Sequence, residues 1–226
     1  MKRILSRMMV TFMTTMATTG SFAAPIDWSN FNSTLIIEVT RPTGVFTSSG
    51  VAISKDTILT AAHCLDGEVL KVRVSNQAAY DPKGKFYAVE SFEIHPDYNV
   101  KKSNYKSDLA KIKLQKYLPE NTMFYPIIKK DENLIGKILR LGFGGRNNQN
   151  VRTLITPEFK SVSISDETLE LNDMYSFSGD SGGPIFIQQG AQMYLIAIHS
   201  TLSYGPNGRY SYNPLLSSQR KWIEND

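Results

Sequence analysis

The stretch Gly179-Asp180-Ser181-Gly182-Gly183-Pro184 is followed by the apolar run Ile185-Phe186-Ile187, so a glycine-rich turn leads directly into a strand. Glycine lets backbone N–H groups face a ligand without a side chain in the way. A loop of this composition can therefore offer a serine hydroxyl and backbone donors at one place. Taken alone, such a run is usually an ordinary tight turn.

Strand-like alternation dominates the chain on both sides of this turn. Apolar residues recur at every second position in three segments: Leu35, Ile37 and Val39; Leu70, Val72 and Val74; Ala110, Ile112 and Leu114. This period is typical of half-buried strands. Further short strands are predicted at Lys137–Phe143, Pro184–Gln188 and Met193–His199. Many short strands between turn signals indicate an all-β sandwich or barrel, and the one predicted helix covers Leu215–Glu224.

The chain divides near its middle. The stretch Tyr117–Asn133 contains Pro119 and Pro126, carries several charges and lacks clear alternation. We interpret it as the connection between two β-domains. The predicted organisation is an N-terminal domain over residues 25–120, a linker over 121–133 and a C-terminal domain over 134–226.

Residues 1–24 are predicted to be a secretory signal peptide. Lys2, Arg3 and Arg7 precede the modestly apolar stretch Met8–Thr19, and Ser21-Phe22-Ala23 offers small residues before a cleavage site. A membrane anchor is the alternative, but the stretch is short and rich in threonine. We therefore expect a secreted or periplasmic protein that does not remain in a membrane after cleavage.

Charge and cysteine content narrow the possible partners. The signal peptide carries three positive charges and no acidic residue, so its removal lowers the formal net charge from +4 to +1. This weakens an interpretation as a nucleic-acid-binding protein. The single cysteine, Cys64, excludes an internal disulfide, so the core alone must stabilise the fold.

Three segments carry residues suited to nucleophilic catalysis, namely Thr60–Cys64, Ser107–Leu114 and Gly179–Pro184. A serine hydroxyl needs a neighbouring imidazole to accept its proton, and the imidazole needs a carboxylate behind it. The oxyanion that forms needs donors already aimed at it. Each residue alone could be a core histidine, a turn aspartate or a turn serine, but the chain order His63, Asp108, Ser181 favours a triad.

At these residues the sequence resembles the trypsin/chymotrypsin-type serine proteases, along nearly the whole chain after the signal peptide. The motifs that carry the resemblance are Ala61–Cys64, Ile94–Asn99, Ser107–Ala110, Gly142–Gly144, Gly179–Pro184, Asn207–Tyr210 and Lys221–Ile223. The resemblance implies an all-β, chymotrypsin-like fold: two six-stranded antiparallel β-barrels with a C-terminal helix and the active site between the barrels.

The resemblance also implies a role for each matching residue. His63 would be the general base and then the general acid, Asp108 would orient it, and Ser181 would be the nucleophile. The N–H groups of Gly179 and Ser181 would form the oxyanion hole, and Ser200 would support Asp108. The loop histidine His95 is expected to be structural.

Two departures from the family pattern affect the surroundings of the triad. Cys64 lacks its usual disulfide partner, because the matching position is Ser48, and it is expected to be a free, buried thiol. Asp180 in the family pairs with a new N-terminal Ile or Val. Ile26 is the nearest candidate here, although Pro25 precedes it, and an unpaired Asp180 would be a costly buried charge.

The predicted substrate pocket does not resemble that of trypsin. Tyr175 stands where a trypsin-like enzyme carries Asp, while Ser176 and His199 together resemble the glutamyl endopeptidases and would bind an acidic side chain. Two alternatives remain: Tyr175 fills the floor with His199 merely packed, or Leu202 narrows the entrance and favours small apolar residues. The pocket residues are expected to be Tyr175, Ser176, His199, Ser200, Thr201, Leu202 and Gly208.

We therefore expect a secreted serine endopeptidase that acts on protein or peptide substrates as a monomer, through an acyl-enzyme, with no cofactor, no metal and no nucleic-acid partner. One alternative is a secreted binding protein on the same fold that has lost catalysis. A second is an esterase, but Gly179–Gly183 leads into a strand and does not form an elbow between strand and helix.

Overall fold

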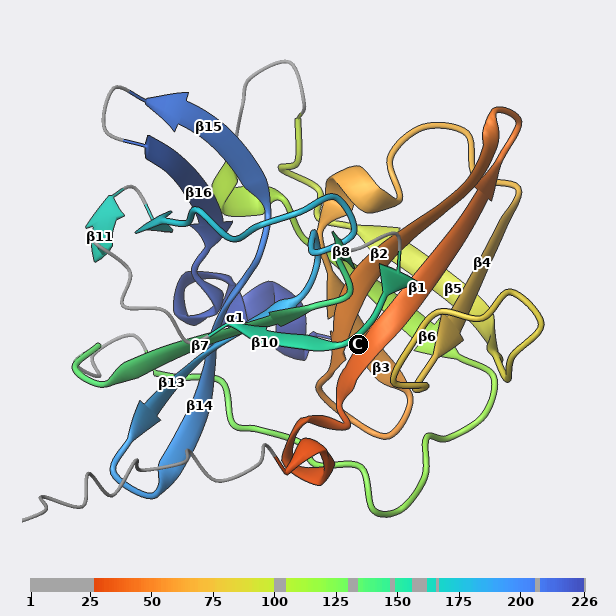
Figure 1. The fold of residues 1–226 in the computed structure, drawn as a ribbon, viewed down its shortest axis with the longest axis horizontal. Coiled ribbons are helices and arrows are strands. Elements are labelled where there is room, and N and C mark those ends of the chain that lie inside the picture. Colours follow the sequence, from red (N-terminus) through yellow and green to blue (C-terminus); the bar gives the residue numbers. More distant parts are fainter. Residues whose placement is uncertain are drawn as a thin grey trace, which may run out of the picture.

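The computed structural model describes residues 27–99, 105–129, 134–146, 149–155, 162–165, 167–205 and 208–225. These residues form a mostly β structure with one α-helix near the C-terminus, as Figure 1 shows. Within the described ranges, short 3-10 helices lie at Trp28–Phe31, Ala62–Cys64 and Tyr105–Ser107. The described part contains no helix that is long and apolar enough to cross a membrane.

The first half is a closed antiparallel barrel. Its strands follow the order β1 (Thr34–Arg41), β2 (Gly44–Ala52), β3 (Thr57–Thr60), β6 (Ala110–Leu114), β5 (Tyr87–Ile94) and β4 (Lys71–Ser75). The apolar residues that alternate along the sequence fill the interior of the barrel, where Leu35, Ile37 and Val39 pack with Ile112 and Leu114. A closed six-stranded barrel was predicted for this half, and it is confirmed.

The second half consists mainly of two four-stranded antiparallel sheets. One has the order β10 (Thr153–Ile155), β7 (Lys137–Gly142), β13 (Pro184–Gln189) and β14 (Gln192–Ile198). The other has the order β11 (Val162–Ser165), β12 (Thr168–Asn172), β16 (Gly208–Pro214) and β15 (Thr201–Gly205). A bridge between Ala197 and Leu215 joins the sheets, and a small ribbon pairs β8 (Gly145–Arg146) with β9 (Gln149–Asn150). The arrangement agrees with a chymotrypsin-like fold, although its strands divide into separate sheets where a second single barrel was predicted.

Helix α1 spans Leu216–Glu224, one residue shorter than predicted, and it connects the two halves. The Trp222 indole packs against the His95 ring in a tilted arrangement, with centroids 4.7 Å apart and an interplanar angle of 57°, and Trp222 Nε1 donates to Glu93 of β5. Lys111 of β6 donates to the carbonyl oxygens of Trp222 and Asn225. His95 is therefore buried in a packing contact, as its expected structural role requires.

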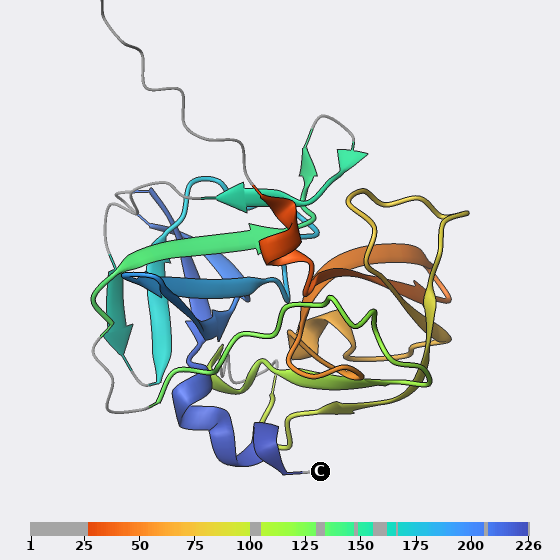
Figure 2. The ribbon, with the colours of Figure 1, turned by 90° about the horizontal axis from the view of Figure 1, so that it is seen from below.

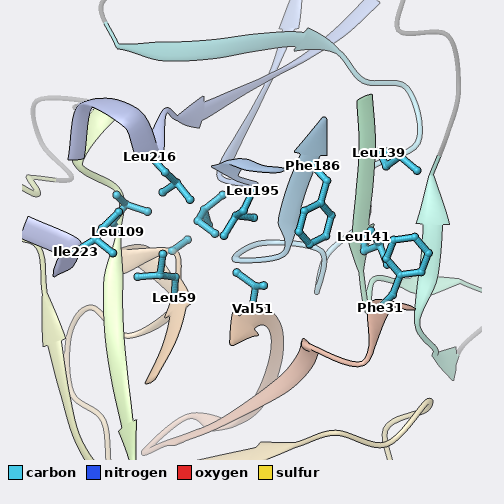
Figure 3. Close-up of a cluster of buried hydrophobic side chains, with 12 residues drawn as sticks. Phe31, Val51, Leu59, Leu109, Leu139, Leu141, Phe186, Leu195, Leu216 and Ile223 are labelled. Carbon is cyan, nitrogen blue, oxygen red and sulfur yellow. The ribbon is translucent and has the colours of Figure 1, made fainter. Parts of the chain in front are cut away.

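One hydrophobic core spans both halves, as Figure 3 shows. Val51, Leu59 and Leu109 of the first half meet Leu141 and Phe186 of the second half. Figure 2 shows the two halves side by side with α1 at their edge. Because the core is shared, neither half can move freely relative to the other, and residues at their junction are held in fixed positions.

We expect Phe186→Ala to lower the free energy of unfolding by about 3–5 kcal/mol, because it leaves a cavity in the shared core. Phe186 is fully buried and its ring packs against Phe31 and Tyr125. Urea unfolding followed by circular dichroism measures the change. Phe124→Ala is the control, because Phe124 is 40% exposed. An equal loss in both variants would contradict the assigned core.

Candidate active site

Strand pairing brings His63 and Asp108 together. His63 lies in the 3-10 helix just after β3, and Asp108 lies just before β6. Strands β3 and β6 are antiparallel neighbours with Thr60 opposite Ala110. Residues 45 positions apart in the sequence therefore meet at the same end of the barrel.

Asp108 holds His63 at two points. Its Oδ1 accepts the backbone N–H of His63 at 2.8 Å, and its Oδ2 lies 2.7 Å from His63 Nδ1. Ser200 Oγ also donates to Oδ2, so the buried carboxylate is well satisfied. A carboxylate can only accept, so Nδ1 carries a proton in either charge state of the ring, and in the neutral imidazole Nε2 is the acceptor.

The same contacts decide in which direction the pKa values of Asp108 and His63 shift. Burial alone would raise the pKa of Asp108, but hydrogen bonds from His63 and Ser200 and the His63 charge outweigh it and lower the pKa. Burial alone would lower the pKa of His63, but the Cys64 sulfur and the Asp108 carboxylate raise it. Asp108 therefore stays ionised at neutral pH and stabilises an imidazolium at His63.

Ser181 lies across the cleft from this pair. A cavity of about 200 Å³ is lined by Ser178, Gly179 and Ser181 from the second half and by His63 and Cys64, among others, from the first. Within the described residues no hydrogen bond joins Ser181 Oγ to His63. Hydrogen bonds in active sites often tighten only when substrate is bound, so the position of Ser181 and His63 in one cleft is compatible with a hydrogen bond in the substrate complex.

The backbone of the serine loop leaves two donors open. Asp180 N–H donates to Phe177 O, and Gly182 and Gly183 donate to His199 O and Asp180 O. No hydrogen bond among the described residues uses the N–H of Gly179 or Ser181. The Ser178 carbonyl accepts from Gly145 N–H at 3.0 Å, and since N–H and C=O of a trans peptide point in opposite directions, Gly179 N–H points away from that contact.

Asp180 has an internal positive partner. Arg140 Nη1 lies 3.1 Å from Asp180 Oδ2, and both side chains are fully buried. The backbone N–H groups of Gly144 and Phe177 also donate to the Asp180 carboxylate, at 2.7 and 3.0 Å. Ile26, the candidate partner considered from the sequence, lies outside the described residues. Arg140 was missed, although a charge inside the apolar strand Leu139-Arg140-Leu141 is a signal that could have been used.

Ser49 of β2 is a second contributor that the sequence analysis missed. Its Oγ donates to Gly179 O at 2.7 Å and accepts from Phe143 N–H at 2.9 Å, and its N–H donates to Ser181 O at 2.8 Å. Gly182 has φ +83°, and a Cβ there would lie 2.1 Å from Ser49 O. Hydrogen bonds from the first barrel therefore hold the serine loop in place. The close approach of Ser49 O allows only glycine at position 182.

Ser176 and His199 form a buried pair. Ser176 Oγ lies 2.6 Å from His199 Nε2, and His199 Nδ1 lies 3.1 Å from Asn213 Oδ1. Asn213 Nδ2 donates to Leu169 O, so Oδ1 faces His199 and requires a proton on Nδ1. Ser176 O–H therefore donates to Nε2. Burial and the Arg140 charge lower the pKa of His199 to about 4, so its imidazole is neutral at pH 7.

The other predicted pocket residues surround this pair less closely. Tyr175 is 53% exposed, so its side chain does not fill a buried floor. Thr201 and Leu202 lie half-buried on β15, opposite Tyr212 and Ser211 of β16, whereas Gly208 pairs with Gly205 at the turn end of the β15–β16 hairpin. Arg209, also missed, donates from Nη2 to Ser176 O at 2.8 Å, while its Nε is buried without a hydrogen-bond partner in the described part.

Cys64 is a free thiol, as predicted, but its surroundings differ from the expectation. It is half-buried, where a fully buried thiol was expected, because it lines the cleft beside His63. Ser48, at the position expected for the missing partner of Cys64, is buried, and its Oγ has no hydrogen-bond partner among the described residues. The histidine loop is instead tied by Arg41, which donates to the carbonyl oxygens of Cys64 and Asp66.

The structure is that of a chymotrypsin-like β-protein. It has a closed antiparallel barrel, a second β half and a cleft between them that is lined by His63 and Ser181. The chain belongs to the trypsin family, because the family model described as Trypsin matches residues 23–223.

Individual relatives are distant and of different kinds. A CLIP domain-containing serine protease B4 of Anopheles gambiae is 24% identical over 80% of this chain and 61% of its own length. A glutamyl endopeptidase of Staphylococcus aureus is 27% identical over 80% of this chain and 48% of its own length. Granzyme B of Homo sapiens is 26% identical over 70% of each chain. The chain thus spans about half to two thirds of the length of these relatives.

We expect Ser49→Ala to lower the free energy of unfolding by about 1–3 kcal/mol, because it leaves a buried carbonyl and a buried N–H without their partner. Urea unfolding measures this loss. Ser91→Ala on exposed β5 is the control and should change stability by no more than about 0.5 kcal/mol. If Ser49→Ala behaves like Ser91→Ala, the clamp on the serine loop is not a stabilising contact.

Proposed function

We propose that this protein is a serine endopeptidase in which His63, Asp108 and Ser181 form the catalytic triad. The observation that carries the proposal is the orientation of His63. Its Nδ1 is fixed by a buried carboxylate at 2.7 Å, and its ring lines the same cleft as Ser181. This arrangement suits a base that takes a proton from a serine hydroxyl.

The proposed reaction follows from these positions. Ser181 Oγ attacks the carbonyl carbon of the peptide while its proton passes to His63 Nε2. The N–H groups of Gly179 and Ser181 stabilise the oxyanion, since no other acceptor in the described part uses them. The His63 imidazolium, stabilised by Asp108, then protonates the leaving amine. Water releases the acyl group by the same steps, with His63 again as base.

We further propose a preference for an acidic residue before the cleaved bond. Ser176 O–H and His199 can become donors to a carboxylate if the substrate replaces their mutual hydrogen bond and His199 takes up a proton. Arg209 adds a positive charge beside Ser176. The similarity to a glutamyl endopeptidase is in line with this preference. Trypsin-like specificity has no support, because the buried Asp173 is already paired with Arg140.

We propose export to the cell exterior or periplasm through residues 1–24, which lie outside the described part. A binding protein without catalysis would have no need for open Gly179 and Ser181 donors opposite an oriented His63, so endopeptidase activity is favoured.

We expect Ser181→Ala to reduce peptide hydrolysis by about 10⁴-fold or more and to leave the unfolding transition unchanged, because only the nucleophile is removed. A serine-reactive phosphonate followed by mass spectrometry should label Ser181 in the unmodified protein. Ser178→Ala is the matched control, since Ser178 lines the same cleft, and it should still be labelled at residue 181. Comparable turnover by Ser181→Ala would remove Ser181 from the mechanism.

Cleavage of a peptide library should show enrichment of Glu or Asp immediately before the cut. Arg209→Gln should lower kcat/KM for acidic peptides by about 10-fold, the loss expected for one charge-assisted contact. Arg220→Gln is the control, because Arg220 pairs with Glu224 on α1 away from the pocket. Enrichment of Lys or Arg before the cut would overturn the proposed specificity.

A further inference from the structure

A buried cluster of three charges lies directly beneath the serine loop. Arg140 of β7 has no exposed surface, and its Nε lies 2.7 Å from Asp173 Oδ2 while its Nη1 lies 3.1 Å from Asp180 Oδ2. Both carboxylates are also fully buried. Nη2 donates a hydrogen bond to Asp173 Oδ1 at 3.3 Å, whereas the Nε and Nη1 contacts are ion pairs outside hydrogen-bond geometry.

The two carboxylates hold the two segments that build the candidate site. Asp180 accepts from Gly144 N–H and Phe177 N–H and directly precedes Ser181. Asp173 accepts from Tyr175 N–H at 3.0 Å, at the start of the pocket wall. Glycine is required at position 144, because a Cβ there would lie 2.6 Å from Asp180 Oδ1. The position of Arg140 is therefore transmitted to both segments through backbone hydrogen bonds.

A buried carboxylate next to the nucleophile needs a positive partner, because an uncompensated charge in the interior is strongly destabilising. In this structure the partner is a side chain of the central strand β7, which is paired on one side with β13 and on the other with β10. The ion pair between Arg140 and Asp180 therefore forms without a new chain terminus.

We propose that Arg140 is the positioning residue that keeps the serine loop in its donor-open conformation, so that activity does not depend on a particular N-terminus produced by proteolysis. This inference rests on the proposed endopeptidase function. In this protein the internal guanidinium of Arg140 takes the place of the α-ammonium group that the family resemblance implies as the partner of Asp180.

The two kinds of cation differ in their dependence on pH. A free α-ammonium group loses its proton near pH 8 and a free lysine near pH 10.4, and a neighbouring carboxylate raises both values, whereas a guanidinium stays charged above pH 12. A loop held by Arg140 therefore keeps its positive partner throughout the alkaline range. A loop held by a terminus would lose its positive partner at alkaline pH, once the paired α-ammonium group deprotonates.

The first test changes the N-terminus and leaves Arg140 in place. A short Gly-Ser extension is inserted between Ala24 and Pro25, and mass spectrometry establishes the terminus of the purified protein. We expect phosphonate labelling of Ser181 to proceed within about two-fold of the rate of the unextended protein, as for a surface change remote from the site. Labelling that begins only after the extension is removed would overturn the proposal.

The second test changes the cation. Relative to the unmodified protein, Arg140→Lys should lose labelling at alkaline pH, as the lysine deprotonates while a guanidinium would stay charged. Arg73→Lys is the matched control, because Arg73 also pairs with a buried carboxylate, Glu38, but in the first barrel away from the cleft. The control should follow the unmodified protein at every pH. An Arg140→Lys profile that also follows it would overturn the proposal.

Thermal unfolding over the same pH range separates the two hypotheses. If no protein is labelled at any pH, the endopeptidase proposal fails. A selective alkaline fall in the Tm of Arg140→Lys would still support Arg140 as the partner of Asp180. If the unmodified protein is labelled but Arg140→Lys shows no selective fall in labelling or Tm, the inference about Arg140 fails while the proposed function stands. If Arg140→Lys does not fold, the extension experiment decides, since it leaves the ion pair untouched.

Discussion

The pairing of Arg140 with Asp180 and Asp173 is the constraint on which the rest of the site depends. Three fully buried charged side chains can persist only if they are held against one another, because each would be costly alone in a medium of low dielectric constant. Their positions are fixed in turn by the central strand β7 and by backbone donors. The segment before Ser181 and the start of the pocket wall consequently share one electrostatic anchor.

A second constraint is the contact between the halves of the molecule. The His63–Asp108 pair belongs to the first barrel and Ser181 to the second half, so these three residues share one cleft only if the halves keep a fixed relation. The shared hydrophobic core supplies most of that rigidity, and Ser49 adds directional hydrogen bonds from β2 to the serine loop. Apolar contacts alone would set the distance, whereas the hydrogen bonds also set the orientation of the loop.

The same site separates two uses of histidine. His63 lies next to an ionised carboxylate, which stabilises its protonated form and raises its pKa. His199 has neutral hydrogen-bonding partners in Ser176 and Asn213, and burial together with the charge of Arg140 lowers its pKa to about 4. Burial and neighbouring charge thus favour the protonated form of one histidine and the neutral form of the other.

The sequence by itself determined the all-β character and the C-terminal helix, because alternation and turn residues are local properties of the chain, whereas the closed first barrel followed from the family resemblance. It also indicated His63, Asp108 and Ser181, since each lies in a short motif with a chemical reason for its composition. Only the tertiary structure decided that Arg140 partners Asp180, that Ser49 clamps the serine loop and that Asn213 fixes the tautomer of His199. These partners lie far from one another in the sequence, and the requirement that every buried polar group be satisfied is met only when distant strands come together.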